Sequence, residues 1–420
     1  MSTDGKSILA RYLVLSGANV AAAGFGFIVV LMIVDWFGAG GLGDISLALS
    51  VSSYALVVAA FGTEVYAVKQ LAADRGTIGT MTSSVIVIRA AAALLTYGGV
   101  IVLVIVVPRF EQIGPLLALL GFSVFANAIN TVWVAQAKHQ THLVAAASLA
   151  TQALYLAFVV GFLFAGSGLW GVAAARVLAE LCVALASVGW VRRRFGALQP
   201  PLPWRELREF AVASAPLAGT HLLRGMTLGS DVLILGFMVD RLELGYYSAV
   251  VRLFFLMMTL AGAYFVILLP RLAERAAAPA IMRREVRDSL KRSVPLALVG
   301  CGLVLVLAAP MVTVVFGPEF VVAVPALRLL SLVVVVNLVG RHYRQVLVAT
   351  GRQVVDLRMT GIGAVVHVVA KLGLIPAFGI TGAALGTLVG ESTIAGLLWW
   401  SARQTVAPSG VVVGGDGERP

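Results

Sequence analysis

Apolar runs long enough to cross a bilayer recur along the whole chain, separated by short polar or Gly/Pro segments. Strands of a membrane barrel are about ten residues long and alternate polar with apolar side chains. These runs are longer and do not alternate, so we exclude a barrel. A spanning helix needs about 20 mostly apolar residues. The pattern therefore predicts an all-α polytopic membrane bundle of about twelve transmembrane helices, over residues 10–34, 44–68, 80–107, 113–136, 142–165, 168–190, 211–236, 244–270, 291–315, 321–348, 355–376 and 380–402.

Lys and Arg alternate between the predicted connections. One set of connections carries nearly all of them, and the other set carries only Arg109 and Arg241. Basic residues collect on cytoplasmic loops. The alternation predicts that both termini are cytoplasmic.

Composition agrees with a chain that faces lipid. Hydrophobic residues make up 60% of its 420 residues and charged residues 12%, about half the charged fraction of a typical soluble domain. The net charge of +11 follows from the bias of the loops, and we find no motif for binding nucleic acid. The two cysteines, Cys182 and Cys301, lie in apolar runs and form no disulfide framework.

The sequence shows no pattern typical of an enzyme. A GxxxxGK[ST] phosphate loop is absent, so ATP is not the expected driver, and no His, Cys and Asp residues have the spacing of metal ligands. We therefore predict no cofactor and no metal.

Prolines in the segment Gln199–Trp204 divide the chain into two halves of six spans. The predicted organisation is an N-lobe (1–194), a cytoplasmic linker (195–209), a C-lobe (210–404) and a disordered tail (405–420). The sixth span begins GLWGVA at Gly168 and the twelfth begins GITGAA at Gly379. Similar segments at matching places indicate a duplication, and two such lobes would enclose a central cavity typical of a transporter that works by alternating access.

Several segments carry a family resemblance. They are Asp231–Phe237 (DVLILGF), Leu244–Leu253 (LGYYSAVVRL), Leu269–Ala273 (LPRLA) and Gly379–Ala384 (GITGAA). In this order they resemble the polysaccharide and oligosaccharide flippases of the multidrug/oligosaccharidyl-lipid/polysaccharide exporter superfamily. The resemblance implies a multi-pass protein of the bacterial inner membrane. Its substrate would be a lipid-linked (undecaprenyl-pyrophosphate) oligosaccharide for surface polysaccharide biosynthesis, and a polysaccharide polymerase could be its partner.

Charged residues inside apolar spans need a partner or a wet cavity, because an unpaired Arg at a helix centre costs about 2.5–3.5 kcal/mol. The candidates for a cationic cavity that receives phosphate are Arg224, Arg252, Arg341, Arg344, Arg89, Lys371 and His221. Asp231 and Glu391 are the candidates for coupling transport to H⁺ or Na⁺. Structural roles remain open for these residues, including an Asp231–Arg252 pair and a local Arg176–Glu180 pair.

Two other functions stay open at this point. A drug or cation exporter of the same superfamily should line its cavity with acids, whereas here the buried bases outnumber the buried acids. A membrane-embedded glycan polymerase or glycosyltransferase usually needs a catalytic acid or a large periplasmic loop, whereas the predicted periplasmic connections are all short.

Overall fold

The structure of the protein is a computed structural model that describes residues 3–72, 77–274 and 278–406. The described residues form helices and no strand, which confirms the predicted all-α class. The α-helices are α1 (Thr3–Ala60), α2 (Thr63–Ala72), α3 (Ile78–Val106), α4 (Gly114–Gly121), α5 (Ser123–Ile129), α6 (Val132–Ala137), α7 (Thr141–Phe164), α8 (Gly168–Phe195), α9 (Trp204–Leu228), α10 (Ser230–Met238), α11 (Arg241–Glu274), α12 (Pro279–Phe316), α13 (Val324–Ala349) and α14 (Gln353–Val406); η1 (Pro108–Phe110) and η2 (Pro318–Ala323) are short 3-10 helices.

Nine helices of the described part are long and apolar enough to cross a membrane. Two of them, within α1 and α14, are far longer than one crossing needs. The backbone is non-helical inside each, at Gly38 (φ 63°) and Gly379 (φ 52°). A positive φ is accessible to glycine without steric cost, so each long helix is two helices joined at a glycine. The total of twelve spans remains a prediction.

The two halves that the sequence predicts to be duplicated also have similar backbone conformations. Gly168 and Gly379, at the start of corresponding spans, both have a positive φ (60° and 52°). A second similarity is in two corresponding connections, the one between the third and fourth predicted spans and the one between the ninth and tenth. In each case a 3-10 turn begins with a proline, at Pro108 and Pro318, and the Phe two residues later is fully buried. Such paired features at near-constant sequence offset support duplication of a six-helix unit.

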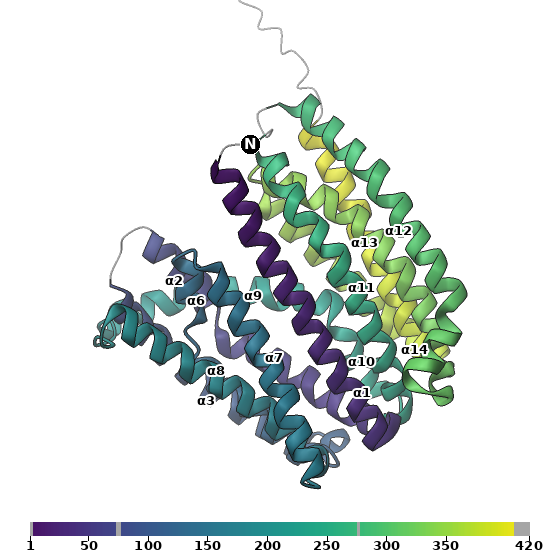
Figure 1. Ribbon diagram of the computed structural model, residues 1–420, viewed down its shortest axis with the longest axis horizontal. Coiled ribbons are helices and arrows are strands. Elements are labelled where there is room, and N and C mark those ends of the chain that lie inside the picture. Colours follow the sequence, from purple (N-terminus) through teal and green to yellow (C-terminus); the bar gives the residue numbers. More distant parts are fainter. Residues whose placement is uncertain (1–2, 73–76, 275–277, 407–420) are drawn as a thin grey trace, which may run out of the picture.

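The helices form two lobes, which diverge toward the end of the molecule where the N-terminus lies (Figure 1). We call this the basic end, because the arginines that end α8 and those that begin α12 lie there. The largest cluster of buried apolar side chains includes residues of both lobes. Toward the basic end it gives way to separate clusters, one around Trp133 and Phe210 and another around Phe265 and Val346. The lobes therefore share their main core away from the basic end, and at the basic end only the start of α9 packs on the N-lobe cluster among the described residues.

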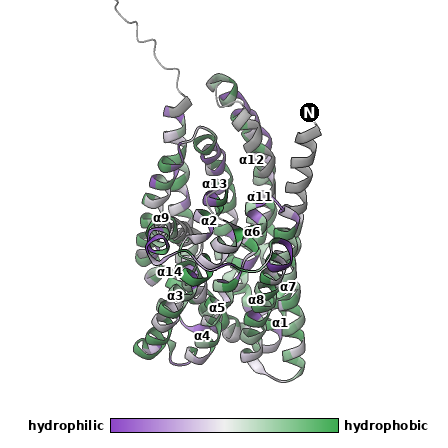
Figure 2. Ribbon diagram, turned by 90° about the vertical axis from the view of Figure 1, so that its left-hand side faces the viewer, coloured by the Kyte–Doolittle hydropathy of each residue, from purple (hydrophilic) through white to green (hydrophobic). Residues whose placement is uncertain are grey.

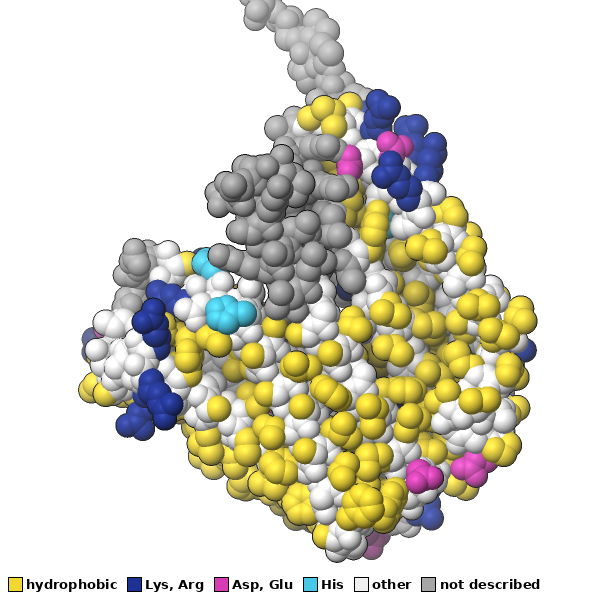
Figure 3. All heavy atoms as spheres, in the orientation of Figure 1, with side chains coloured by type: hydrophobic (Ala, Val, Ile, Leu, Met, Phe, Trp, Pro, Cys, Tyr) yellow, Lys and Arg dark blue, Asp and Glu magenta, His cyan; other side chains and the backbone are white. Residues whose placement is uncertain are grey.

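Apolar side chains cover the surface between the two ends, and Lys and Arg gather at the basic end (Figure 3). The same division appears along the helices when they are coloured by hydropathy (Figure 2). On α12, Leu296, Val299 and Val306 are each at least 70% exposed. Such a belt is stable against lipid and unfavourable against water.

The lobes meet closely at the end opposite to the basic end. Arg109 of the N-lobe donates from Nε to the carbonyl oxygen of Gly236 at 2.7 Å and also bonds the carbonyl of Val239. The start of α11 lies against the kink of α1, where a Cβ on Gly245 would be only 1.8 Å from the carbonyl oxygen of Ala39. Only glycine allows this approach, so the structure has this end closed.

The connection between the lobes is shorter than predicted. Helix α8 ends at Phe195 and α9 already begins at Trp204, so the non-helical linker is 196–203 and not 195–209. The first turns of α9 pack on the N-lobe, because Leu207 and Phe210 are buried in the cluster around Trp133. The prolines before Trp204 end the non-helical segment, since a helix can begin directly after a proline. The predicted tail is described only as far as residue 406.

The contact at Gly245 yields a first prediction. Gly245→Ala should force α1 and α11 apart and lower the unfolding temperature of the purified protein by several degrees, since such overpacking costs about 1–3 kcal/mol. Gly300→Ala is the matched control, because a Cβ at Gly300 meets no atom within 4 Å. Equal melting temperatures for the two variants would contradict the close approach of the lobes.

Candidate functional site

A polar cavity of about 350 Å³ lies between the lobes. Both halves of α1, together with α7 and α8, contribute its N-lobe wall, and α10 and α11 contribute its C-lobe wall. The α11 residues that line it, Ser248 to Phe255, are 7 to 14 residues from the start of that helix, or about 10–21 Å along its axis. The cavity therefore lies about two to four helical turns from the closed end of the molecule.

Two arginines, Arg176 of α8 and Arg252 of α11, line this cavity from opposite lobes. Arg176 donates from Nε to Glu180 Oε1 at 2.6 Å, which confirms the predicted local pair, and its guanidinium lies 5.5 Å from the centre of the Tyr155 ring. The guanidinium of Arg252 has neither an ion pair nor a hydrogen bond within the described part of the chain. Arg252 therefore leaves a cation available to an anionic ligand in the cavity.

Four neutral polar side chains of the cavity wall also lack partners. The hydroxyl oxygens of Ser46, Ser50 and Ser248 and the amide oxygen of Gln152 are buried and form no hydrogen bond with any described residue. Buried polar atoms nearly always have a partner. Their number here indicates that the cavity holds water or a ligand rich in hydrogen-bonding groups.

This set of groups fits an anion attached to a polar molecule. A guanidinium binds phosphate oxygens through paired N–H groups, and hydroxyl and amide groups can bond both phosphates and sugar hydroxyls. The described residues that line the cavity include no acid. The arrangement favours anionic over cationic ligands.

Arg89, one of the predicted cavity cations, lies inside the N-lobe. Its Nε donates to Thr63 Oγ1 at 2.8 Å, and Nη1 donates to the carbonyl oxygens of Asn127 and Asn130. Nη2 is 3.6 Å from Glu64 Oε2. Arg89 is 2% exposed and does not line the cavity; its contacts join α3 to α2 and to the end of α5.

Arg341 and Arg344 of α13 also lie outside the cavity. Arg344 pairs with Asp356 of α14, with 2.9 Å between Nε and Oδ1, and its Nη2 donates to Thr360 at 3.3 Å. The Arg341 guanidinium lies 5.4 Å from the centre of the Phe265 ring. Both side chains therefore contact other helices within the C-lobe.

Lys371 and Asp231 form a buried ion pair inside the C-lobe. Lys371 Nζ also donates to Ser230 Oγ at 3.0 Å, while Tyr247 and Thr387 donate hydroxyl hydrogens to Asp231 Oδ2 at 2.6 and 2.9 Å. Asp231 thus pairs with Lys371 across α10 and α14, and the alternative of a fixed Asp231–Arg252 pair is wrong. The network satisfies both charges and joins α10, α11 and both halves of α14.

Glu391, the other predicted coupling residue, is buried in the same lobe. It accepts a hydrogen bond from Asn337 Nδ2 at 2.8 Å, and its Oε1 is 3.9 Å from His367 Nε2. Neither ring nitrogen of His367 forms a hydrogen bond with a described residue. The structure brings this acid and this histidine together, although 24 positions separate them.

Two predicted cavity residues, His221 and Arg224, fall on α9, but their side chains lie outside the described residues. Sequence reasoning missed the cavity role of Arg176, because its pair with Glu180 explains it locally. The serines were missed too. A stripe of Ser46, Ser50 and Ser53 along one face of an apolar span is the signal that could have found them.

No group of three or more His, Cys, Asp and Glu side chains that could hold a metal occurs within the described ranges.

The cavity between two duplicated helical lobes defines this protein as a polytopic membrane protein of transporter architecture. Residues 40–325, about two thirds of the chain, match the sequence profile of a family described as "Polysaccharide biosynthesis protein". The chain therefore belongs to the polysaccharide biosynthesis protein family, as its sequence motifs indicate. No curated protein matches it.

Several solved transporter structures are similar to this chain in fold. The inward closed conformation of the lipid II flippase MurJ has a TM-score of 0.80 at 12% identity, over 94% of this chain and 89% of that chain. An inward-facing multidrug resistance MATE family transporter of the MOP superfamily has a TM-score of 0.66 at 15% identity, over 94% of both chains. A MOP superfamily transporter from Pyrococcus furiosus, described with a binding pocket of reverse polarity, has 0.56 at 15% identity, over 94% and 95%. At these identities the likeness is one of fold.

The Asp231–Lys371 pair yields a second prediction. Lys371→Met should leave Asp231 buried without its counter-ion, which costs about 3–5 kcal/mol, and should lower the unfolding temperature strongly. Adding Asp231→Asn should restore much of the loss, because both charges are then gone. We would measure thermal unfolding of the wild type, both single variants and the double variant. Additive losses in the double variant would contradict a direct pair.

Proposed function

We propose that this protein flips a lipid-linked oligosaccharide, carried on undecaprenyl pyrophosphate, across the bacterial inner membrane for surface polysaccharide biosynthesis. The observation that carries the proposal is Arg252, a cation without an ionic partner among the described residues, in a polar cavity between the lobes. A pyrophosphate supplies the missing anion, and the sugar hydroxyls complement the unpaired serines and Gln152. Membership of the polysaccharide biosynthesis family supports this substrate class.

The proposed mechanism is alternating access around the cavity, without a catalytic step. The lobes share a core away from the basic end and have separate cores toward it, so opening there needs less apolar surface to be exposed. The basic end is cytoplasmic in this proposal, following the positive-inside rule. The head group enters from that side, and parting of the lobes around Gly245 and Arg109 releases it on the other.

Ion coupling is the second part of the proposal. Glu391 is the better candidate, because its nearest ionisable neighbour, His367, lacks hydrogen bonds to described residues. A proton or Na⁺ there would change the charge between α13 and the two halves of α14. Asp231 has its charge neutralised by Lys371, and we assign it a role in holding the C-lobe together.

A drug exporter remains the alternative within the superfamily, because a multidrug transporter shares the fold. A cavity lined by Arg176 and Arg252 disfavours cationic drugs, since like charges repel and each cation would lose its hydration on entry. A polysaccharide polymerase is the expected functional partner, since the flipped product must be consumed on the far side.

The third prediction tests the cavity cation. Arg252→Gln should lower transport about tenfold or more, because a hydrogen bond to a charged group contributes about 1.5–3 kcal/mol. Arg252→Lys should restore only part of it, since an ammonium cannot make the paired contact. The assay is translocation of a fluorescent undecaprenyl-pyrophosphate-linked oligosaccharide in proteoliposomes, normalised to folded protein.

Arg193→Gln is the control for the loss of one positive charge, because Arg193 is an exposed residue at the end of α8. Transport at the wild-type rate by Arg252→Gln would remove this residue from the proposed site. Equal losses in both variants would point to a general effect of charge on the membrane surface.

A further inference from the structure

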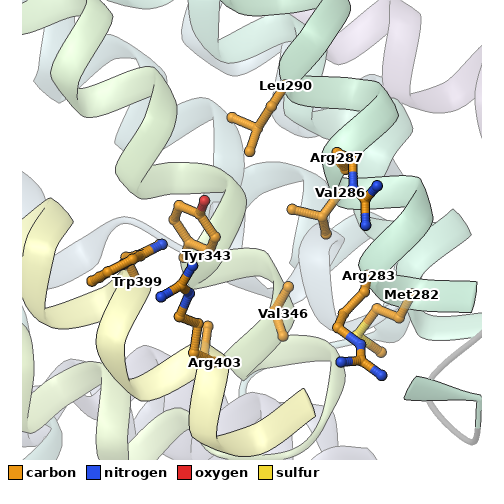
Figure 4. Close-up of a pocket in the computed structure, with 10 residues that line it drawn as sticks. Met282, Arg283, Val286, Arg287, Leu290, Tyr343, Val346, Trp399 and Arg403 are labelled. Atoms are coloured by element: carbon orange, nitrogen blue, oxygen red, sulfur yellow. The ribbon is translucent and has the colours of Figure 1, made fainter. Parts of the chain in front are cut away.

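A second cavity, unconnected with the flipping site by any shared residue, lies in the C-lobe at the basic end. Its volume is about 550 Å³, and α12, α13 and α14 form its walls. Figure 4 shows Arg283 and Arg287 on the α12 wall, with Arg403 on the α14 wall between Tyr343 and Trp399. The three guanidiniums thus border one cavity from two sides.

The cations are available for a ligand. None of the three arginines has an ion pair within the described chain, whereas the neighbouring Arg284 lies 3.9 Å from Asp288. No acidic residue lines the cavity. The Arg403 guanidinium lies 4.1 Å from the centre of the Trp399 ring, a contact that holds the cation in place without neutralising it.

The rest of the cavity is apolar. Met282, Val286, Val346 and Ala402 line it, and each is at least 94% buried. Contact with these apolar side chains adds no binding free energy for a soluble anion. An amphiphile gains binding free energy when the part of its hydrocarbon chain next to the head group is buried against them. The exposed apolar face of α12 continues from the same helix toward the middle of the molecule, with Leu296 74% exposed.

We propose that this cavity binds the anionic head group of a phospholipid in the leaflet at the basic end. Arg283, Arg287 and Arg403 bind the phosphate. The glycerol and the first acyl carbons contact the apolar side chains that line the cavity. Trp399 and Trp400 place the site at the depth of the membrane interface, where tryptophans gather in membrane proteins. The occupant is a structural lipid that stabilises the packing of α12 on α13 and α14, and binding does not depend on flippase activity.

The test measures binding of dioleoyl phosphatidylglycerol to the full-length purified protein by native mass spectrometry. Arg283→Gln/Arg287→Gln/Arg403→Gln should raise the apparent Kd about tenfold or more. The matched control is Arg192→Gln/Arg193→Gln/Arg194→Gln, which removes the same charge from exposed positions at the end of α8. The control should keep the wild-type affinity, and phosphatidylcholine should bind the wild type weakly.

Each other outcome overturns the proposal. Equal losses in the two triple variants would show attraction to surface charge, and competition by glycerol phosphate at the same concentration would show a site for soluble anions. Binding of undecaprenyl pyrophosphate there tenfold more tightly than phosphatidylglycerol would assign the cavity to the transported lipid. If the triple variant fails to fold, the single variant Arg287→Gln, which removes the charge of one exposed side chain, replaces it in the test. An unchanged Kd in Arg287→Gln would then count against the site.

Discussion

The rest of this structure depends on the cost of placing an unpaired charge in hydrocarbon. Within the described chain, Arg89 bonds Thr63 and backbone carbonyls, Arg344 pairs with Asp356, and Lys371 pairs with Asp231. Each of these contacts joins different helices inside one lobe, so the charges that cannot face lipid also fix how the helices pack. Arg252 departs from this rule. Its charge faces a polar cavity between the lobes instead of a fixed partner, and a transported anion can bind there because nothing in the described chain occupies that position.

The two ends of the molecule differ in how the lobes meet, so the two sides of the cavity are closed by different contacts. Away from the basic end, glycines let backbones touch at Gly245, and Arg109 bonds carbonyls of the other lobe. The lobes also share their largest buried apolar cluster over this part of the molecule. At the basic end the buried apolar side chains form two separate clusters, and the start of α9 packs into the one in the N-lobe. The basic end is therefore the end at which the lobes can part with less loss of buried apolar surface.

The sequence predicted much of the fold, because apolar runs, loop charges and repeated glycine segments are local signals. It predicted the candidate site less well. Periodicity shows which face of a helix carries a charge, but not which helix that face meets. Asp231 and Lys371 are 140 positions apart, and no local pattern pairs them. Arg176 was explained by Glu180 one turn away, although it also lines the cavity. The residue that carries the proposal, Arg252, was predicted as a cavity cation, since it stands in an apolar span without a local acid.

The central claim is that the head group of the lipid-linked substrate binds between the lobes beside Arg252. Phe255 lines the cavity one turn from Arg252, whereas Val299 is 70% exposed on the outer face of α12. The direct measurement is site-specific photo-crosslinking with p-benzoylphenylalanine at each position, using radiolabelled undecaprenyl-pyrophosphate-linked oligosaccharide. The account predicts a labelled product from position 255 that disappears when Arg252→Gln is added, and only background labelling from position 299. Labelling at position 255 that is equally strong with Arg252→Gln, or labelling from position 299 alone, would contradict it.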